Sequence, residues 1–173
     1  NKAVKGTAIQ GVLPEQEPKV SVISEKMIAG RLDALKAGDF GIVLGSEMAA
    51  ALGVVPGDKV TIVAPTANAT PAGLLPRLKQ FTLVGIFEIG MHEYDSALSL
   101  IHMDDAQKLF RKDGPDGLRL MTTDMMRAPL IAREVMQQIP GRYGVIDWTQ
   151  QHANFFRALK TEKTVMFVIL TLI

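Results

Sequence analysis

Residues 40–64 read FGIVLGSEMAAALGVVPGDKVTIVA and predict a strand, a helix and a second strand in immediate succession. The apolar run Phe40–Leu44 is typical of a buried strand, and Ser46–Leu52 is rich in residues that favour helices. Gly53 can adopt the left-handed conformation that commonly ends a helix. After a Pro-Gly-Asp turn, Lys59–Ala64 largely alternates in polarity, as a strand with one buried face does. This stretch therefore predicts an α+β fold.

Further strands and helices are expected on both sides of this stretch. The expected strands are Val4–Val12, Phe81–Phe87, Ala97–Ile101, Leu118–Met121 and Gly144–Trp148. Counting the one already described, the expected helices are Ser46–Leu52, a short one between Ser24 and Gly30, Asp104–Phe110, Pro129–Ile139 and one from Gln150 onward. We expect Ser46 to cap the first of these helices, and Asp104 with Gln107 to cap the third, because hydroxyl and carboxylate oxygens accept from the free amides of a first turn.

The pattern of elements changes near Gly114, which predicts two lobes. The first is a β-rich lobe over residues 1–114, from which a loop projects at residues 65–80. The second is a smaller lobe of βαβ type over residues 115–158. Residues 159–173 are expected to begin a membrane-spanning helix.

That last expectation rests on the apolar run Val165–Ile173. A spanning helix needs about 20 largely apolar residues, and this run is shorter. Two alternatives follow: the chain holds the start of a membrane helix, or the run is an unusually apolar core segment. Lys160 and Lys163 just before the run suit the headgroup boundary and favour the membrane. Because the chain starts at Asn1 and stops within this run, we expect it to be a fragment.

Composition excludes several classes of protein. With 47% hydrophobic residues, 21% charged residues and a net charge of +1, the chain resembles neither a disordered tail nor a general nucleic-acid binder. The absence of cysteine excludes disulfide scaffolds, thiolate zinc sites and cysteine nucleophiles. We expect no cofactor, and no nucleic acid among the partners.

Motifs for catalysis are absent or broken. The chain contains no Gly-Lys-Ser/Thr phosphate loop, no Gly-x-Ser-x-Gly elbow and no Gly-x-Gly-x-x-Gly fingerprint. His92-Glu93-Tyr94-Asp95-Ser96 begins like a zinc-protease helix but has serine where the second histidine belongs. A metal site in which His92 and Asp95 converge with His102 and Asp104 remains an alternative, as in a metal-dependent hydrolase. We expect neither a metal nor an active site here.

The loop Thr70–Lys79 is the stronger candidate for function. It holds Leu74, Leu75 and Leu78 in a segment that is expected to be too rich in proline to join a sheet ladder. Its leucines must then either fold back onto the core or project. Prolines stiffen the loop, and a stiff loop loses less entropy on binding.

The sequence resembles a known family over nearly its whole length. The stretch GIVLGSEMAAALGVVPGDKV at residues 41–60 is similar to the extracytoplasmic domain of MacB-type ABC transporter subunits. Four further segments narrow the resemblance to the lipoprotein-releasing transmembrane subunits of the LolC/LolE family: PAGLLP at 71–76, FTLVGIF at 81–87, MDDAQKLF at 103–110 and FRALKTEK at 156–163.

This resemblance implies a periplasmic domain of an inner-membrane subunit, made of a β-rich lobe and a smaller α/β lobe. A separate LolD-like cytosolic ATPase and a second transmembrane subunit would complete the transporter, so this chain would not be an enzyme. Lipoproteins released from the membrane would pass to a LolA-like periplasmic carrier docked on a projecting hook. By position, the carrier-binding residues would be Pro71, Ala72, Gly73, Leu74, Leu75, Pro76, Arg77 and Lys79.

The chain departs from the family at the hook, where Ala72 and Leu75 stand in place of the methionine and arginine that LolC hooks can carry. Thr61 replaces a basic residue of the neighbouring strand. The resemblance leaves open a LolC-like, a LolE-like or a merged subunit. A related MacB- or FtsX-like domain that transmits motion for efflux or for control of cell-wall hydrolases is the alternative function, and it would not need the loop.

Overall fold

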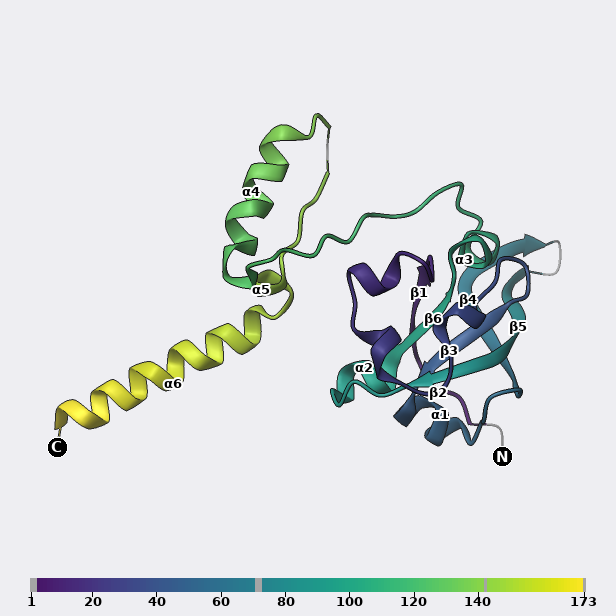
Figure 1. Cartoon of the computed structure of the whole chain (residues 1–173), viewed down its shortest axis with the longest axis horizontal. Coiled ribbons are helices and arrows are strands. Elements are labelled where there is room, and N and C mark those ends of the chain that lie inside the picture. The colour runs from purple at the N-terminus through teal and green to yellow at the C-terminus, as the bar shows by residue number, and fades with distance from the viewer. Residues whose placement is uncertain (1–2, 71–72, 142, 173) are drawn as a thin grey trace. The chain divides into compact units, whose positions relative to one another are not determined.

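The structure is a computed structural model that describes residues 3–70, 73–141 and 143–172. The chain forms two compact units, residues 1–120 and residues 121–173 (Figure 1). Strands and helices are both present, which confirms the predicted α+β class. The first unit includes Arg119, whose guanidinium pairs with the buried carboxylate of Glu17.

The described part of the first unit contains a six-stranded mixed sheet. Its strands are β1 Ala8–Val12, β2 Met27–Gly30, β3 Gly41–Gly45, β4 Lys59–Thr70, β5 Gly73–Phe87 and β6 Leu98–His102. Five of them lie in the order β1-β6-β3-β5-β2, and β4 pairs with β5 as an antiparallel hairpin. The central strand β3 runs parallel to β5 and antiparallel to β6. The hairpin therefore joins the sheet through β5, which lies between β3 and the edge strand β2.

Both faces of this sheet are covered. Ile42 and Leu44 of β3 pack with Met48, Phe81 and Leu83 in one apolar cluster. Val43, between them, packs on the opposite face with the second cluster, whose members include Val12, Leu35, Phe87 and Leu100. Successive residues of a strand point to opposite faces, so a strand buried on both faces needs a continuous apolar run. This is why residues 41–45 are apolar or glycine throughout.

Short helices connect the strands. The α-helices of the first unit are α1 Ser46–Leu52, α2 His92–Ala97 and α3 Met103–Phe110, and its 3-10 helices are η1 Glu17–Lys19, η2 Ile23–Lys26 and η3 Leu32–Ala34. The predicted strand, helix and strand of residues 40–64 are confirmed as β3, α1 and the first half of β4. Gly53 ends α1 with φ of 66°, in the left-handed region that was expected.

The predicted helix caps are wrong. Gly45 occupies the capping position of α1 without a side-chain hydrogen bond, because the helix starts directly where β3 ends and Ser46 is already inside it. His102 caps α3, and its Nδ1 accepts from the backbone N–H of Asp104 at 3.2 Å. Asp104 itself lies inside the first turn, where its carboxylate interacts favourably with the positive end of the helix dipole.

The helix expected between Ser24 and Gly30 is also wrong. Its first part is the 3-10 helix η2, and its second part is strand β2, which pairs antiparallel with residues 85–87 of β5. Pairing at the edge of a sheet outweighs the weak helix preference of so short a segment.

The second unit is helical in its described residues. Its elements are η4 Met125–Arg127, α4 Ala128–Gln138, α5 Trp148–Gln151 and α6 Ala153–Leu172. Trp148 donates its indole N–H to the carbonyl of Met125 at 2.8 Å, which ties α5 to η4. The carboxylate of Asp147 caps α5 by accepting from the backbone N–H groups of Thr149 and Gln150.

The strands predicted at Leu118–Met121 and Gly144–Trp148 do not form in the described residues. Leu118 is 89% exposed and Ile146 is 75% exposed. A strand is stable only when its backbone pairs with a neighbouring strand, and these short segments have no such neighbour among the residues that the structure describes. The predicted βαβ arrangement of the smaller lobe is therefore corrected to helices joined by irregular segments.

Helix α6 continues without interruption through the apolar run at residues 165–172. Among the described residues, no helix combines the length and the apolar character needed to cross a membrane.

Candidate docking hairpin

The β4–β5 hairpin occupies the segment where a projecting loop was predicted. The segment was expected to be irregular, and this is wrong for its described residues, because β4 continues into it as far as Thr70 and β5 begins in it at Gly73, in antiparallel register. Asn68 pairs with Leu75, Ala69 with Leu74 and Thr70 with Gly73. Pro71 and Ala72 lie outside the described residues.

Proline is compatible with this ladder because the outer part of the hairpin has only two strands. Strand β3 joins β5 only from Thr82, and β2 joins only from Gly85. Nearer the tip, each strand therefore has one paired and one open edge. A proline lacks the N–H that a strand donates, so it is tolerated at an open edge or at a bulge. Pro76 pairs with Ala67 in such a position.

A bulge interrupts the ladder at the base of this two-stranded part. The register jumps from Ala64 opposite Arg77 to Ala67 opposite Pro76, so residues 65 and 66 have no partner in β5. Extra residues in one strand bend a hairpin and increase its local twist. We call residues 67–76, beyond this bulge, the hairpin tip.

Contacts with helix α3 hold the base of the hairpin. Arg77 donates from Nη1 to the backbone carbonyl of Leu109 at 3.1 Å. Leu109 is buried in the last turn of α3, where backbone carbonyls have no partner within the helix. A cation is favoured at this negative end of a helix.

A second contact involves Lys79, whose Nζ lies 3.5 Å from the centre of the Phe40 ring. Phe40 in turn meets Phe81 edge to face, with ring centres 5.6 Å apart. A cation over an aromatic face contributes about 0.5–1 kcal/mol at an exposed site. The hairpin base is thus held both by α3 and by the residue that leads into β3.

The histidines and acidic residues considered as metal ligands are engaged elsewhere. Asp95 is buried and accepts from the backbone N–H groups of Ile89 and Gly90 at 2.9 and 2.8 Å. His92 pairs with Glu47, and His102 caps α3 as described above. Within the described part of the chain, no three histidine, aspartate or glutamate side chains come together as a metal site. The arrangement considered for a metal-dependent hydrolase is not formed there.

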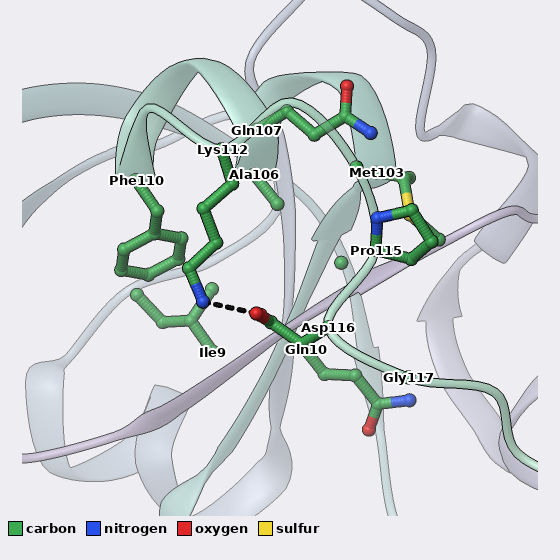
Figure 2. Close-up of a pocket in the computed structure, with 12 residues that line it drawn as sticks. Ile9, Gln10, Met103, Ala106, Gln107, Phe110, Lys112, Pro115, Asp116 and Gly117 are labelled. Carbon is green, nitrogen blue, oxygen red and sulfur yellow. Dashed lines mark hydrogen bonds and ion pairs between the residues drawn. The ribbon is translucent and has the colours of Figure 1, made fainter. Parts of the chain in front are cut away.

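A cavity of about 250 Å³ lies between β1, α3 and the segment that follows α3 (Figure 2). Gln10 and Gln107 supply amides to its lining, and Phe110 supplies an aromatic ring. Lys112 and Asp116 also line it, but they form an ion pair with each other, drawn as the dashed line in Figure 2. Neither charge is left unpaired to attract a ligand.

No protein-family model matches the chain. The chain does match several curated proteins. It is 44% identical over 165 residues to the lipoprotein-releasing system transmembrane protein LolC of Xylella fastidiosa strain 9a5c, and it is 42% identical over 172 residues to the LolC protein of Neisseria meningitidis serogroup B. These matches cover 95% and 98% of the chain. The LolC protein of Haemophilus influenzae is 30% identical over 144 residues, 82% of the chain.

This chain belongs to the LolC family. The resemblance drawn from the sequence motifs is thereby confirmed. The chain spans about 40% of the length of the first two LolC relatives and 35% of the third.

The residues expected to form the hook of a LolC-family protein fall into two groups. Gly73, Leu74, Leu75 and Pro76 belong to β5 in the hairpin tip, next to Pro71 and Ala72, which lie outside the described residues. Arg77 and Lys79 lie on the other side of the bulge, at the hairpin base, and both contact their own domain.

Sequence reasoning missed the residues that support this hairpin, namely Phe40, Asp105 and Leu109. The sequence did contain one signal that could have pointed to them. Asp105 and Leu109 stand four residues apart on one face of α3, and both are buried. A carboxylate on the buried face of a helix must be paired or hydrogen-bonded, so its position pointed to a specific polar contact.

Proposed function

We propose that this chain is a periplasmic domain of an inner-membrane ABC transporter subunit that releases lipoproteins, and that the hairpin tip docks a soluble, LolA-like lipoprotein carrier. The family membership supports the transporter assignment, because the matched relatives are named as lipoprotein-releasing system proteins. A separate LolD-like cytosolic ATPase supplies the energy, and a second transmembrane subunit completes the transporter.

One observation carries the docking proposal: the β4–β5 ladder extends beyond the strands that flank it, as far as the pair Thr70 and Gly73. An isolated two-stranded hairpin is marginally stable in water. This one continues from a packed sheet and is anchored at its base to α3 and Phe40. Such an arrangement presents a short segment to a partner at a low entropic cost.

The partner surface is proposed to accept Leu74 and Leu75. Burying one leucine side chain contributes about 1.5–3 kcal/mol, and about 1.4 kcal/mol corresponds to a tenfold change in affinity. Replacing both leucines with aspartate removes this contribution and adds two charges that would need to be desolvated. We expect the double variant to lose detectable binding.

The test is a calorimetric titration of the purified chain with a soluble LolA-like carrier. Leu74→Asp/Leu75→Asp is compared with Ile28→Asp/Val55→Asp, a matched control at two exposed apolar residues outside the hairpin. The control should bind as the unmodified chain does. Unchanged affinity in the Leu74/Leu75 variant would show that the hairpin tip is not the docking surface.

We further propose that helix α6 couples the membrane part of the transporter to this domain. The support is its continuity from Ala153 to Leu172, which joins a polar, charged first half to the apolar run without a break. A continuous helix transmits a displacement along its axis more directly than an irregular segment does. This role concerns release of the lipoprotein, and docking of the carrier does not depend on it.

A further inference from the structure

We propose that Arg119 is a positioning residue for lipoprotein release. By binding the buried carboxylate of Glu17, it ties the end of the irregular residues 112–120, which we call the connecting segment, to the first unit. A displacement of the chain beyond this point is then transmitted to the first unit at Glu17. The functional part of this inference rests on the proposed coupling role of α6, whereas the anchoring concerns only residues of the first unit.

The connecting segment has few other attachments. It follows α3 and forms no helix or strand. Residues 115–121 are all exposed, and Leu118 exposes 89% of its surface. Asp116 pairs with Lys112 inside the segment. Among the described residues 113–120, the side chain of Arg119 therefore makes the one hydrogen bond to another described part of the chain.

The carboxylate that receives Arg119 belongs to a well-packed part of the first unit. Glu17 is only 4% exposed, and its backbone N–H donates to the carbonyl of Leu13 at 3.0 Å. In sequence it lies between Val12 and Ile23, which are both buried in the second apolar cluster. A guanidinium binds a carboxylate through charge-assisted hydrogen bonds, which are stronger than neutral ones. Arg119 is thus attached to a fixed point.

This ion pair shortens the free chain that leads to the second unit. With the pair formed, irregular chain runs from Arg119 to Met125, where η4 begins, whereas without the pair it runs from Lys112. An extended chain spans at most about 3.5 Å per residue, so the pair removes roughly half of the available reach. A slack segment absorbs a displacement before it pulls on its far end. The shorter segment therefore transmits more of the displacement.

Anchoring must be distinguished from simple compensation of a buried charge. Removing one member of a buried ion pair is strongly destabilising, whereas replacing both members with apolar residues of similar size is often neutral. Glu17→Met/Arg119→Met should therefore unfold in urea at nearly the same midpoint as the unmodified chain, although its connecting segment is released. Arg119→Met alone should unfold at a lower urea concentration.

The anchoring is measured in the purified chain. The chain contains no cysteine, so Ala51→Cys on α1 and Leu118→Cys, both at exposed positions, provide two unique sites for spin labels. Pulsed electron–electron double resonance then gives the distribution of distances between the labels. Glu17→Met/Arg119→Met should broaden this distribution. Arg119→Lys, which keeps a charged donor, should remain close to the unmodified width.

Arg31→Met is the matched control, because Arg31 is an exposed arginine of the same unit whose ion pair with Asp33 lies outside the connecting segment. It should change neither the distribution nor the urea midpoint. An unchanged width in Glu17→Met/Arg119→Met would overturn the anchoring. Equal widths in Arg119→Met and Arg119→Lys would also overturn it, and this comparison remains decisive if the double variant does not fold.

The functional part is tested with two insertions in the full-length protein within its transporter. A Gly-Ser-Gly-Ser insert after Gly114 lengthens the chain ahead of the anchor, and the same insert after Met121 lengthens it behind the anchor. Only the second should reduce lipoprotein release, because only it adds slack between Arg119 and η4. Exposed loops tolerate such inserts, so carrier binding should be unchanged in both. Equal release by the two variants would overturn the functional part.

Interruption of α6 by Ala158→Gly/Leu159→Gly separates this inference from the proposed function. If that variant releases lipoproteins normally, the proposed coupling fails, and the label distances still decide whether Arg119 anchors the connecting segment. If that variant loses release while the insert after Met121 does not, the coupling role of α6 stands and the role of Arg119 in release is overturned. Loss of release in both, with normal release by the insert after Gly114, supports the inference.

Discussion

The carboxylate of Asp105 accepts a hydrogen bond from the backbone N–H of Phe40 at 3.1 Å. Phe40 has a φ of 51°, a left-handed conformation that is strained for a bulky side chain. The other oxygen of Asp105 accepts from Gly38 at 2.9 Å, so one buried carboxylate holds the turn that places the Phe40 ring beneath Lys79. Helix α3, the entry to β3 and the hairpin base are thereby joined through a few polar contacts.

Removing this carboxylate should destabilise the first unit strongly. Asp105→Ala leaves the N–H groups of Gly38 and Phe40 without their acceptor, and the expected loss is on the order of 3 kcal/mol in the free energy of unfolding. Asp105→Asn keeps one acceptor oxygen and should lose less. Urea denaturation measures both variants. Equal stability of Asp105→Ala and the unmodified chain would show that the two hydrogen bonds make no net contribution to the free energy of unfolding.

Gly45 should not tolerate even a methyl group. A Cβ at this position would lie 2.3 Å from the carbonyl oxygen of Asp95, because helix α2 approaches the end of β3 closely. Gly45→Ala should therefore lower the free energy of unfolding by about 1–3 kcal/mol. Gly6→Ala is the control, since among the described residues no atom other than those of Gly6 and its two chain neighbours lies within 4 Å of a Cβ there. Thermal unfolding that gives the same midpoint for both variants would contradict the close approach.

The capping carboxylate of α5 should make the second unit sensitive to acid. A hydrogen bond from the Thr149 side chain, together with bonds from backbone N–H groups and the Gln150 side chain, holds the pKa of Asp147 below its ordinary value, although desolvation acts in the opposite direction. A carboxyl whose pKa is lower in the folded state stabilises that state above the unfolded pKa, about 3.9 for aspartate. The contribution is lost as the pH falls through the folded pKa.

The check compares the unmodified chain with Asp147→Asn, which retains an acceptor oxygen but does not titrate. The stability advantage of the unmodified chain should be constant above about pH 4 and should shrink below it. Carboxyl titration by NMR should give Asp147 a midpoint below the ordinary value for aspartate. A midpoint at or above the ordinary value would contradict the capping account.

Interrupting helix α6 should abolish release of the lipoprotein without affecting docking of the carrier. Glycine costs about 1 kcal/mol relative to alanine in the interior of a helix, so Ala158→Gly/Leu159→Gly should weaken the first half of the helix. In the full-length protein, we expect lipoprotein release to be lost while carrier binding is retained. Ala158→Leu keeps the helix intact and serves as the control. Loss of carrier binding in the glycine variant would indicate misfolding and would count against the coupling role.

Local patterns were sufficient for the elements whose determinants are close in sequence. The apolar run at residues 41–45, the helix formers after it and Gly53 each act on neighbouring residues, so β3, α1 and the end of α1 were predicted correctly. The family was also found from sequence motifs. The strands expected at residues 118–121 and 144–148 failed because strand formation depends on a partner strand, which sequence alone does not supply.

The β4–β5 hairpin shows the same difference between what local sequence predicts and what the tertiary structure decides. Its prolines argued against a ladder, and the argument would hold for a strand with neighbours on both sides. The open edges near the tip removed that restriction, and the bulge accommodated residues 65 and 66. Neither fact is visible in a stretch of sequence, because both depend on where β2 and β3 stop pairing with β5.

By itself, the sequence determined the α+β character, the strand–helix–strand unit of residues 40–64 and membership of the LolC family, since each depends on residue types at short spacing. Only the tertiary structure decided that β4 and β5 pair as an antiparallel hairpin as far as Thr70 and Gly73, and that Arg77 and Lys79 contact α3 and Phe40. Those contacts join residues more than 30 positions apart, and their geometry is set by the packing of the sheet against α3.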